Sequence, residues 1–398
     1  MESQLRELSK WLSSPNTVGE PEEIFDELNQ RLFQTGIQLQ RASCGLNTMH
    51  PEVYAKQLIW QEGKGTHSAL PSHETVASSM FVNSPVAYVL RERVKLHLNL
   101  EVPEDELQYD FCREMKKEGA TDYLILPLPF RNGGFSFISW STIDPGGFLP
   151  EEIELLEELV PWVSLRLELE SARFVTSSLL RTYLGDNAAQ KVLCGAFKKG
   201  SGELIHAVIL SCDLRGFTSR VDSSSIEHVL QDLDQYFSCV AKPIMEQGGE
   251  VLKYIGDAVL GVFPFIESET AACANALRAV AYAFRSLEQI NNKQKNLERV
   301  EIKFGVALHI GTVMFGNIGT EKRLDFTVIG SAVNEVCRVE AMCKELGQEL
   351  LVTQTFITAS QRQDAVSLGL HSLRGVEEKH ELYTFNIEEL CRQLTTEK

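Results

Sequence analysis

Two aspartates in the second half of the chain follow apolar segments and could act on a common site. Asp213 closes an apolar, strand-like segment that begins near residue 205, and Asp257 stands at a tight turn within a strand–turn–strand pattern over residues 248–263. Carboxylates at neighbouring strand ends suit a pair of Mg²⁺ ions, because Mg²⁺ prefers oxygen ligands and usually shares them with substrate phosphates. Such ions can activate an attacking oxygen and neutralise a triphosphate. Taken alone, Asp213 would more simply be read as a strand-end residue that caps the next helix.

A glycine-rich segment over residues 304–330 leads into a helix that carries an amide and a guanidinium. Asn334 and Arg338 are four residues apart, so they share one face of that helix. An amide beside a fixed guanidinium suits a ribose and a phosphate that gains charge during a reaction. Without the other two segments, both residues would be read as ordinary surface positions.

Together and in this order, the three segments closely resemble the catalytic domain of class III nucleotidyl cyclases over residues 204–386. This resemblance implies that Asp213 and Asp257 bind two metal ions, either Mg²⁺ or Mn²⁺. The backbone carbonyl of Leu214 would assist. It also implies that Asn334 orients the ribose and that Arg338 stabilises the charge that develops at the α-phosphate.

The resemblance also places Lys253 and Thr327 where the family reads the purine. A lysine paired with threonine or aspartate suits adenine, because the lysine donates to ring N1 and its partner accepts from the exocyclic amine. Guanylyl cyclases tend to carry glutamate and cysteine at these places. The pairing therefore favours ATP and resembles a bacterial subclass that includes bicarbonate-responsive cyclases.

The implied reaction is an in-line attack of the ribose 3′-oxygen on the α-phosphorus of ATP, which gives 3′,5′-cyclic AMP and pyrophosphate. One metal ion would lower the pKa of the 3′-hydroxyl, and the other would hold the β- and γ-phosphates. Some relatives carry a phosphate-binding arginine where this chain has Gly305, so that contact is missing or comes from elsewhere. Arg374 lies near the place of a late basic residue that contacts the γ-phosphate in relatives, and is a further candidate for substrate binding.

The family's active sites are shared between two protomers, and this chain contains both half-sets of residues. The resemblance therefore implies a homodimer with two equivalent sites. A predicted helix over 151–174 carries an apolar stripe of Leu156, Val160, Val163 and Leu167. This stripe could extend the dimer or pack on its own N-terminal domain, and the sequence leaves both possibilities open.

The elements that position these residues predict an α/β (α+β) protein of two domains. Residues 201–387 are the expected cyclase domain, with a ferredoxin-like βαββαβ core implied by the resemblance, and 388–398 are a tail. Residues 151–200 are expected to be a helical connector, with helices over 151–174 and 177–184 and a short third helix capped by Asp186. Residues 1–150 combine early helices with a mixed region whose clearest strands, over 122–140, would form a hairpin turning at 131–134.

The N-terminal region resembles a GAF-like sensor in the order of its expected elements. The resemblance concerns architecture and includes no diagnostic motif. It implies regulation of the catalytic domain by an unidentified signal or small ligand. Five aromatic residues could line a small-molecule pocket, although core packing is the simpler interpretation: Trp60, Phe81, Tyr88, Phe137 and Trp140.

Composition excludes several other classes of protein. The 398 residues include 38 Lys and Arg against 55 Asp and Glu, a formal net charge of −17, so the chain should repel nucleic acids and anionic lipids. No segment approaches the roughly 20 apolar residues of a membrane span, and the N-terminus lacks the features of a secretory signal. Nine cysteines without a C-x-x-C pair favour free thiols in a reducing cytoplasm.

An adenylate cyclase, a phosphorus–oxygen lyase regulated by its N-terminal domain, is the favoured function. Two alternatives remain: a guanylate cyclase, opposed by only two residues, and a catalytically silent dimeric sensor that keeps the fold. Degenerate relatives usually lose a metal aspartate or the Asn/Arg pair, whereas all six of these residues are present here: Asp213, Asp257, Lys253, Thr327, Asn334 and Arg338.

Overall fold

The computed structural model describes residues 2–17, 19–47, 55–130, 136–196, 198, 200–295, 299–375 and 378–394. The chain divides into two compact units, Met1–Thr182 and Tyr183–Lys398. Each unit has its own sheet and its own apolar core. None of the helices in the described ranges is both long enough and apolar enough to cross a membrane.

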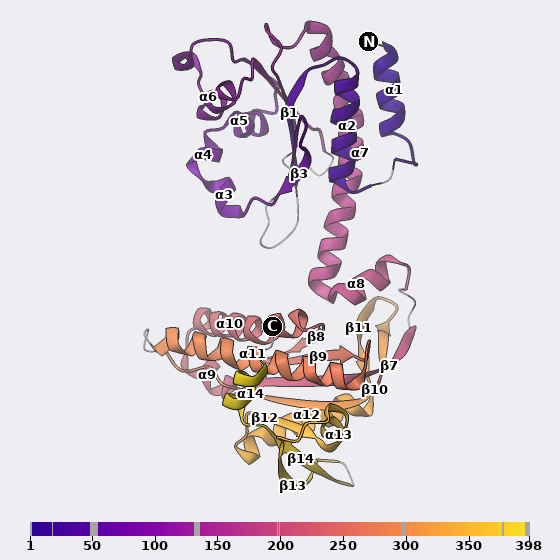
Figure 1. The fold of residues 1–398 in the computed structure, drawn as a ribbon, viewed down its shortest axis with the longest axis vertical. Helices are drawn as coiled ribbons and strands as arrows, with labels where there is room; N and C mark the ends of the chain where they lie inside the picture. Colours follow the sequence, from indigo (N-terminus) through magenta and orange to yellow (C-terminus); the bar gives the residue numbers. More distant parts are fainter. Residues whose placement is uncertain are drawn as a thin grey trace. The chain divides into compact units, whose positions relative to one another are not determined.

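The first unit is built on a six-stranded antiparallel sheet with the order β3-β2-β1-β6-β5-β4 (Figure 1). The strands are β1 (Leu39–Asn47), β2 (Ala55–Gln61), β3 (Gly65–Ala69), β4 (Leu96–Asn99), β5 (Asp122–Pro127) and β6 (Phe137–Thr142). Strands β5 and β6 pair as the predicted hairpin. Its predicted turn, 131–134, lies outside the described residues.

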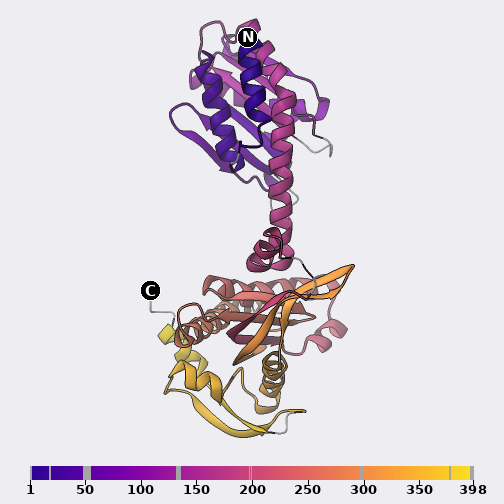
Figure 2. The same cartoon turned by 90° about the vertical axis from the view of Figure 1, so that its right-hand side faces the viewer.

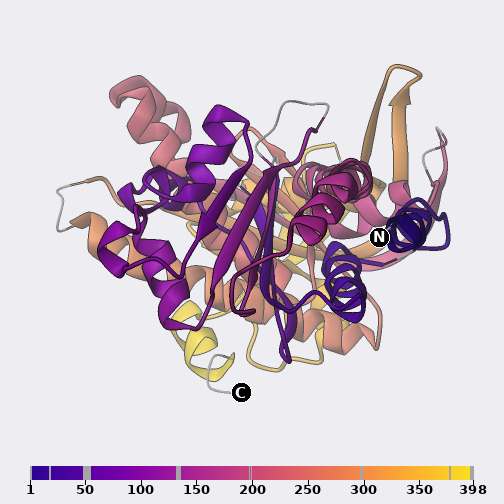
Figure 3. The ribbon, with the colours of Figure 1, turned by 90° about the horizontal axis from the view of Figure 1, so that it is seen from above.

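Helices cover both faces of this sheet (Figures 1 and 3). One face packs against α1 (Glu2–Leu12), α2 (Pro21–Gln34) and α7 (Pro150–Leu184). On the other face lie α3 (His73–Ala77), α4 (Ser79–Val82), α5 (Pro85–Glu92) and α6 (Asp110–Lys117), with a short 3₁₀ turn at Glu104–Glu106. Because successive side chains of a strand point to opposite faces, each strand contributes side chains to the packing on both faces of the sheet.

Helix α7 differs from the sequence prediction of separate helices over 151–174 and 177–184, because it runs without a break for 35 residues. Leu156, Val163 and Leu167 are buried in the core of the first unit, so the predicted stripe packs on its own domain. Helix α8 (Asp186–Leu193) follows. Gly185, not Asp186 as predicted, holds the N-cap position, because a left-handed φ of 83° there lets the chain turn between the two helices.

The second unit has an eight-stranded sheet with the order β13-β14-β12-β10-β7-β9-β8, and β11 pairs with β10. The strands are β7 (Gly202–Leu214), β8 (Glu250–Ile255), β9 (Ala258–Pro264), β10 (Phe304–Thr320), β11 (Arg323–Ile329), β12 (Leu350–Thr353), β13 (Val366–Ser372) and β14 (Lys379–Thr384). The hairpin of β10 and β11 extends from the body of this unit (Figure 2).

The helices of the second unit complete the predicted core. They are α9 (Phe217–Ser223), α10 (Ile226–Glu246), α11 (Glu269–Lys295), α12 (Ser331–Leu346), α13 (Gln354–Ser360) and α14 (Ile387–Leu394). Helices α9 and α10 connect β7 to β8, and α11 connects β9 to β10, so the central order β10-β7-β9-β8 is that of a ferredoxin-like βαββαβ core. Helices α10 and α11 pack on one face of the sheet and α12 on the other. The α+β prediction is therefore confirmed.

Candidate active site

Asp213 and Asp257 lie side by side at one end of the central strands. Asp213 is the penultimate residue of β7, and Asp257 lies in the tight turn between β8 and β9. Burial and the neighbouring Asp257 carboxyl group, which is close enough to hydrogen-bond, raise the pKa of Asp213 to about 6. A divalent cation would remove this repulsion, so the pair is chemically suited to a metal ion.

Few side chains other than these two carboxylates could complete a metal site. Leu214 ends β7 with its side chain buried, and its backbone hydrogen-bonds the Asp213 carboxyl group. Among the described residues, no group of three or more His, Cys, Asp or Glu side chains is arranged to hold a metal ion. An ion here would therefore take its other ligands from backbone oxygens, water or the phosphates of a substrate.

An ion pair lies next to the carboxylates. Arg215 Nη2 is 3.1 Å from Glu340 Oε1, and the Glu340 side chain is only 8% exposed. Burial, with Asp213 and Asp257 adding to it against the opposing effect of Arg215, raises the pKa of Glu340 to about 7. The cluster thus contains three carboxyl groups and one guanidinium.

Gly305 makes room for that guanidinium. It pairs with Asp213 across β10 and β7, and a Cβ atom added at Gly305 would overlap Arg215 Nη2. The side chain of Arg215 therefore occupies the volume that a larger residue at position 305 would need.

Lys253 is held toward the strand that carries Thr327 by a residue that the sequence did not predict, Asp325. Lys253 on β8 forms an ion pair with Asp325 on β11. Because Asp325 and Thr327 are two residues apart on one strand, their side chains point to the same side. The structure therefore brings Lys253 to the side of β11 that carries Thr327, with Asp325 as its direct partner.

Asn334 and Arg338 occupy the predicted common face of α12. A Cβ at Gly375 would lie 3.6 Å from Arg338 Nη2, so Arg338 lies close to the turn that also carries the exposed Arg374. Glu340 faces the carboxylates, and Arg338 is about 200° away around the helix at 3.6 residues per turn. Asn334 and Arg338 therefore point away from Asp213 and Asp257 of the same chain.

A match to a known protein family falls within this second unit. Residues 203–389 match the family model described as "Adenylate and Guanylate cyclase catalytic domain". The second unit is therefore similar to a cyclase catalytic domain. An adenylate cyclase of Anabaena cylindrica is 32% identical over 177 residues, which are 43% of this chain and 34% of that protein. Adenylate cyclase 2 of Rhizobium meliloti (strain 1021) is 29% identical over 203 residues, 49% of this chain and 53% of that protein.

The chain thus spans only about a third to a half of the length of these two curated relatives. Among solved structures, the crystal structure of the guanylyl cyclase Cya2 is 26% identical, with a TM-score of 0.41, and covers 46% of this chain and 92% of that one.

The residues that the sequence singled out in the second unit fall into three groups. The carboxylates form one, Lys253 and Thr327 a second, and Asn334, Arg338 and Arg374 a third, on or near α12. Sequence reasoning missed Arg215, Asp325 and Glu340. Strand alternation could have found Asp325, which is two residues before Thr327, whereas the positions of Arg215 and Glu340 depend on packing between β7, β10 and α12.

Proposed function

We propose that the protein is an adenylate cyclase that converts ATP to 3′,5′-cyclic AMP and pyrophosphate. The observation that carries the proposal is the pair of adjacent carboxyl groups, Asp213 and Asp257, within a domain of the cyclase family. These side chains, with the backbone carbonyl of Leu214, would hold Mg²⁺ or Mn²⁺. The bound ions would supply charge neutralisation for the triphosphate and acidify the 3′-hydroxyl.

The other residues of the site would bind and orient the nucleotide. The Lys253 ammonium has three donors, so it can keep its ion pair with Asp325 while it donates to the adenine ring. The Thr327 hydroxyl would accept from the exocyclic amine. Asn334 would hold the ribose, and Arg338 would donate to an α-phosphate oxygen that gains charge in the transition state. Arg374, on the same turn as Gly375, would bind the terminal phosphate.

The proposed enzyme is a homodimer with two shared active sites. The orientation of α12 supports this, because Asn334 and Arg338 point away from the carboxylates of their own chain and would face those of a second copy. Apolar side chains that are exposed beside Lys253 on β8 also favour a partner surface: Tyr254 and Ile255 are 49% and 55% exposed.

Helix α7 offers a second contact between the two copies. Trp162, Leu165 and Leu169 are 40%, 66% and 47% exposed and follow the three- and four-residue spacing of a coiled-coil seam. We call these three residues the α7 stripe. It differs from the stripe predicted from the sequence, which is buried in the first unit. Pairing of two α7 stripes would remove this apolar surface from water.

The first unit is proposed to be a GAF-like sensor of a small ligand that regulates the catalytic domain. Its support is the layered arrangement of helices on both faces of the six-stranded sheet and a cavity on one of those faces.

Product analysis tests the catalytic proposal. The purified chain would be incubated with ATP or with GTP, each with Mg²⁺ and with Mn²⁺, beside the variants Asp257→Asn and Asp234→Asn. Asp234 is an exposed residue of α10 and serves as the matched control. We expect cyclic AMP from ATP alone, lost in Asp257→Asn and kept in Asp234→Asn. Cyclic GMP as the main product would contradict the assignment of Lys253 and Thr327, and the absence of any product would contradict the cyclase activity.

A further inference from the structure

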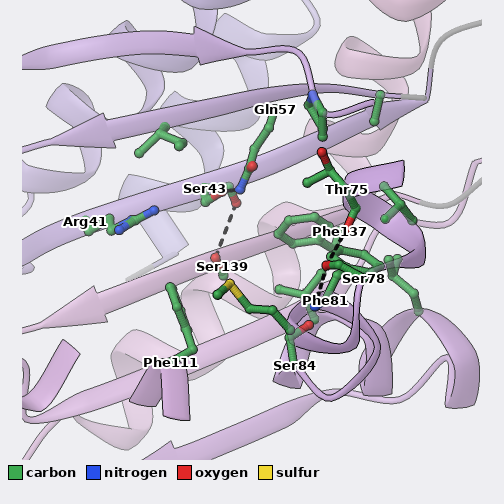
Figure 4. A pocket seen from close by; sticks show the side chains of 18 of the residues that line it. Arg41, Ser43, Gln57, Thr75, Ser78, Phe81, Ser84, Phe111, Phe137 and Ser139 are labelled. Carbon is green, nitrogen blue, oxygen red and sulfur yellow. Dashed lines mark hydrogen bonds between the residues drawn. The ribbon is translucent and has the colours of Figure 1, made fainter. Parts of the chain in front are cut away.

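A cavity of about 320 Å³ lies in the first unit, on the face of the sheet opposite α7 (Figure 4). This volume is at the lower end of the range for small-molecule sites. Alternate residues of β1, namely Arg41, Ser43 and Gly45, form part of its lining, and the segment from α3 to α5 contributes Phe81 and Leu90.

The aromatic residues that the sequence singled out divide between two layers. Phe81 and Phe137 line the cavity. Trp60 and Trp140 belong to the core on the opposite face, where Trp140 Nε1 donates to Asn29 Oδ1 at 3.0 Å. Tyr88 packs on a separate apolar cluster beneath α5 and α6. Only two of the five aromatic residues therefore line the cavity, and its polar groups determine which class of ligand it can bind.

Arg41 is the charged group of this cavity. Its guanidinium lies 5.6 Å from the ring centroid of Phe111. In the part of the chain that the structure describes, no acidic side chain lies within ion-pair distance of it. The contact with the Phe111 ring does not use the N–H groups of the Arg41 guanidinium as hydrogen-bond donors to an oxygen. These N–H groups therefore stay available for a ligand.

A hydroxyl donor lies next along the lining. Figure 4 shows Arg41 at one side of Ser43, and Gln57 and Ser139 lie next to Ser43. Ser43 Oγ accepts from Gln57 Nε2 at 3.0 Å, which leaves its O–H free to donate. The apolar side chains of Phe81 and Phe137 lie on the other side of this group (Figure 4). The cavity thus has a cationic, hydrogen-bonding end and an apolar end.

We propose that this cavity binds a small organic anion with an apolar body, of the chemical class of a medium-chain monocarboxylate. The carboxylate accepts hydrogen bonds from Arg41 and Ser43, which satisfies the guanidinium. The hydrocarbon body packs against Phe81 and Phe137 and is removed from water. The inference rests on the proposed sensory function of the first unit and names the class of its ligand.

Titration calorimetry of the full chain with three probes tests the proposal: octanoate, the neutral octanol, and acetate, which lacks the apolar body. We expect octanoate to bind on the order of tenfold more tightly than either of the others. Arg41→Gln should weaken octanoate binding about tenfold and leave octanol binding unchanged. Arg91→Gln is the matched control, because Arg91 is an exposed arginine of the same unit that pairs with Glu92, and it should bind octanoate like the parent.

Three results would overturn the proposal: octanol bound as tightly as octanoate, octanoate affinity unchanged in Arg41→Gln, or no octanoate binding. If Arg41→Gln fails to fold, Arg41→Lys and Ser43→Ala carry the test, and unchanged octanoate affinity in both would overturn it. Binding is measured without turnover. An inactive chain that binds octanoate through Arg41 would therefore contradict the proposed cyclase function and support the anion site.

Discussion

The guanidinium of Arg215, the residue that directly follows β7, lies in the space left open by Gly305 on the neighbouring strand β10. This arrangement holds Arg215 against the buried Glu340 at 3.1 Å. A cation is therefore present next to Asp213 although position 305, where some relatives carry an arginine, has no side chain. Arg215, directly after the end of β7, supplies this positive charge.

The first prediction follows from this contact. Gly305→Ala should push Arg215 away from Glu340 and lower the free energy of unfolding by about 1–3 kcal/mol through overpacking, as measured by chemical denaturation. In an Arg215→Ala background the same substitution should cost much less, because the new methyl group then has room. Additive losses in this double-mutant cycle would show that the two residues do not compete for one space.

The second prediction concerns the ion pair of Lys253 and Asp325, whose side chains are 39% and 51% exposed. Asp325→Asn should change stability by less than about 1 kcal/mol, because exposed ion pairs contribute little. The KM for ATP should rise several-fold, because Lys253 is no longer held toward the face of Thr327. Asp364→Asn, which breaks the surface pair with Arg362, is the control. Equal KM values in the two variants would argue against a positioning role for Asp325.

The third prediction tests whether the sites are shared between two chains. Asp257→Ala and Arg338→Ala should each be inactive alone. When the two variants assort at random, half of the dimers are mixed and each has one complete site, so about a quarter of the parent activity should return. A mixture of Asp257→Ala with Asp213→Ala should stay inactive, since both changes affect the same half-site. Recovery in neither mixture would contradict shared sites.

The fourth prediction concerns the α7 stripe. Leu165→Lys places a charge in the middle of the proposed seam and should shift the protein toward monomer in sedimentation experiments, with a parallel loss of activity per chain. Glu114→Lys introduces the same side chain at an exposed position of α6, on the face of the sheet opposite α7, and should leave the association state unchanged. If both variants sediment like the parent, α7 does not contribute to the dimer.

The fifth prediction is a pH dependence in the first unit. His97 Nε2 lies 2.6 Å from Asp122 Oδ2, and this hydrogen bond raises the pKa of His97 above the ordinary 6.5, with Lys95 opposing and Glu157 adding to the effect. The protonated form is favoured by folding, so the stabilisation is complete below about pH 6.5 and is lost as the pH rises through the raised pKa.

Thermal melting of the parent and of His97→Gln at several pH values would measure this effect. The stability advantage of the parent should shrink from pH 6.5 upward, whereas His67→Gln, at an exposed histidine of β3, should follow the parent throughout. A pH-independent difference between the parent and His97→Gln would refute the linkage.

The sequence was sufficient to predict the parts of the site that depend on local geometry. Asp213 at a strand end, Asp257 in a tight turn, and Asn334 with Arg338 on one helix face all follow from the periods of strands and helices. The partner of Lys253 was not predictable with the same certainty, because it requires strand β11 to come within reach of β8. That contact depends on the long β10–β11 hairpin, not on spacing along the chain.

The first unit was harder to predict for two physical reasons. The segment of helices α3 to α6 consists of short elements whose apolar residues show little periodicity. Helix α7 carries apolar residues on more than one face, so periodicity alone could not decide which set meets the sheet. Packing buries Leu156, Val163 and Leu167 and leaves Leu165 exposed.

Over residues 41–46 of strand β1, the even-numbered residues face the core and the odd-numbered residues face the cavity. Ala42, Cys44 and Leu46 are buried in the core with α2 and α7, while Arg41, Ser43 and Gly45 line the cavity. One thickness of backbone is all that divides the two environments. A saturation scan along this strand should therefore yield phenotypes that alternate with every residue, poor expression at even positions and altered ligand response at odd ones. Substitutions at the odd positions could therefore change which ligand the cavity binds while the core with α2 and α7 stays intact.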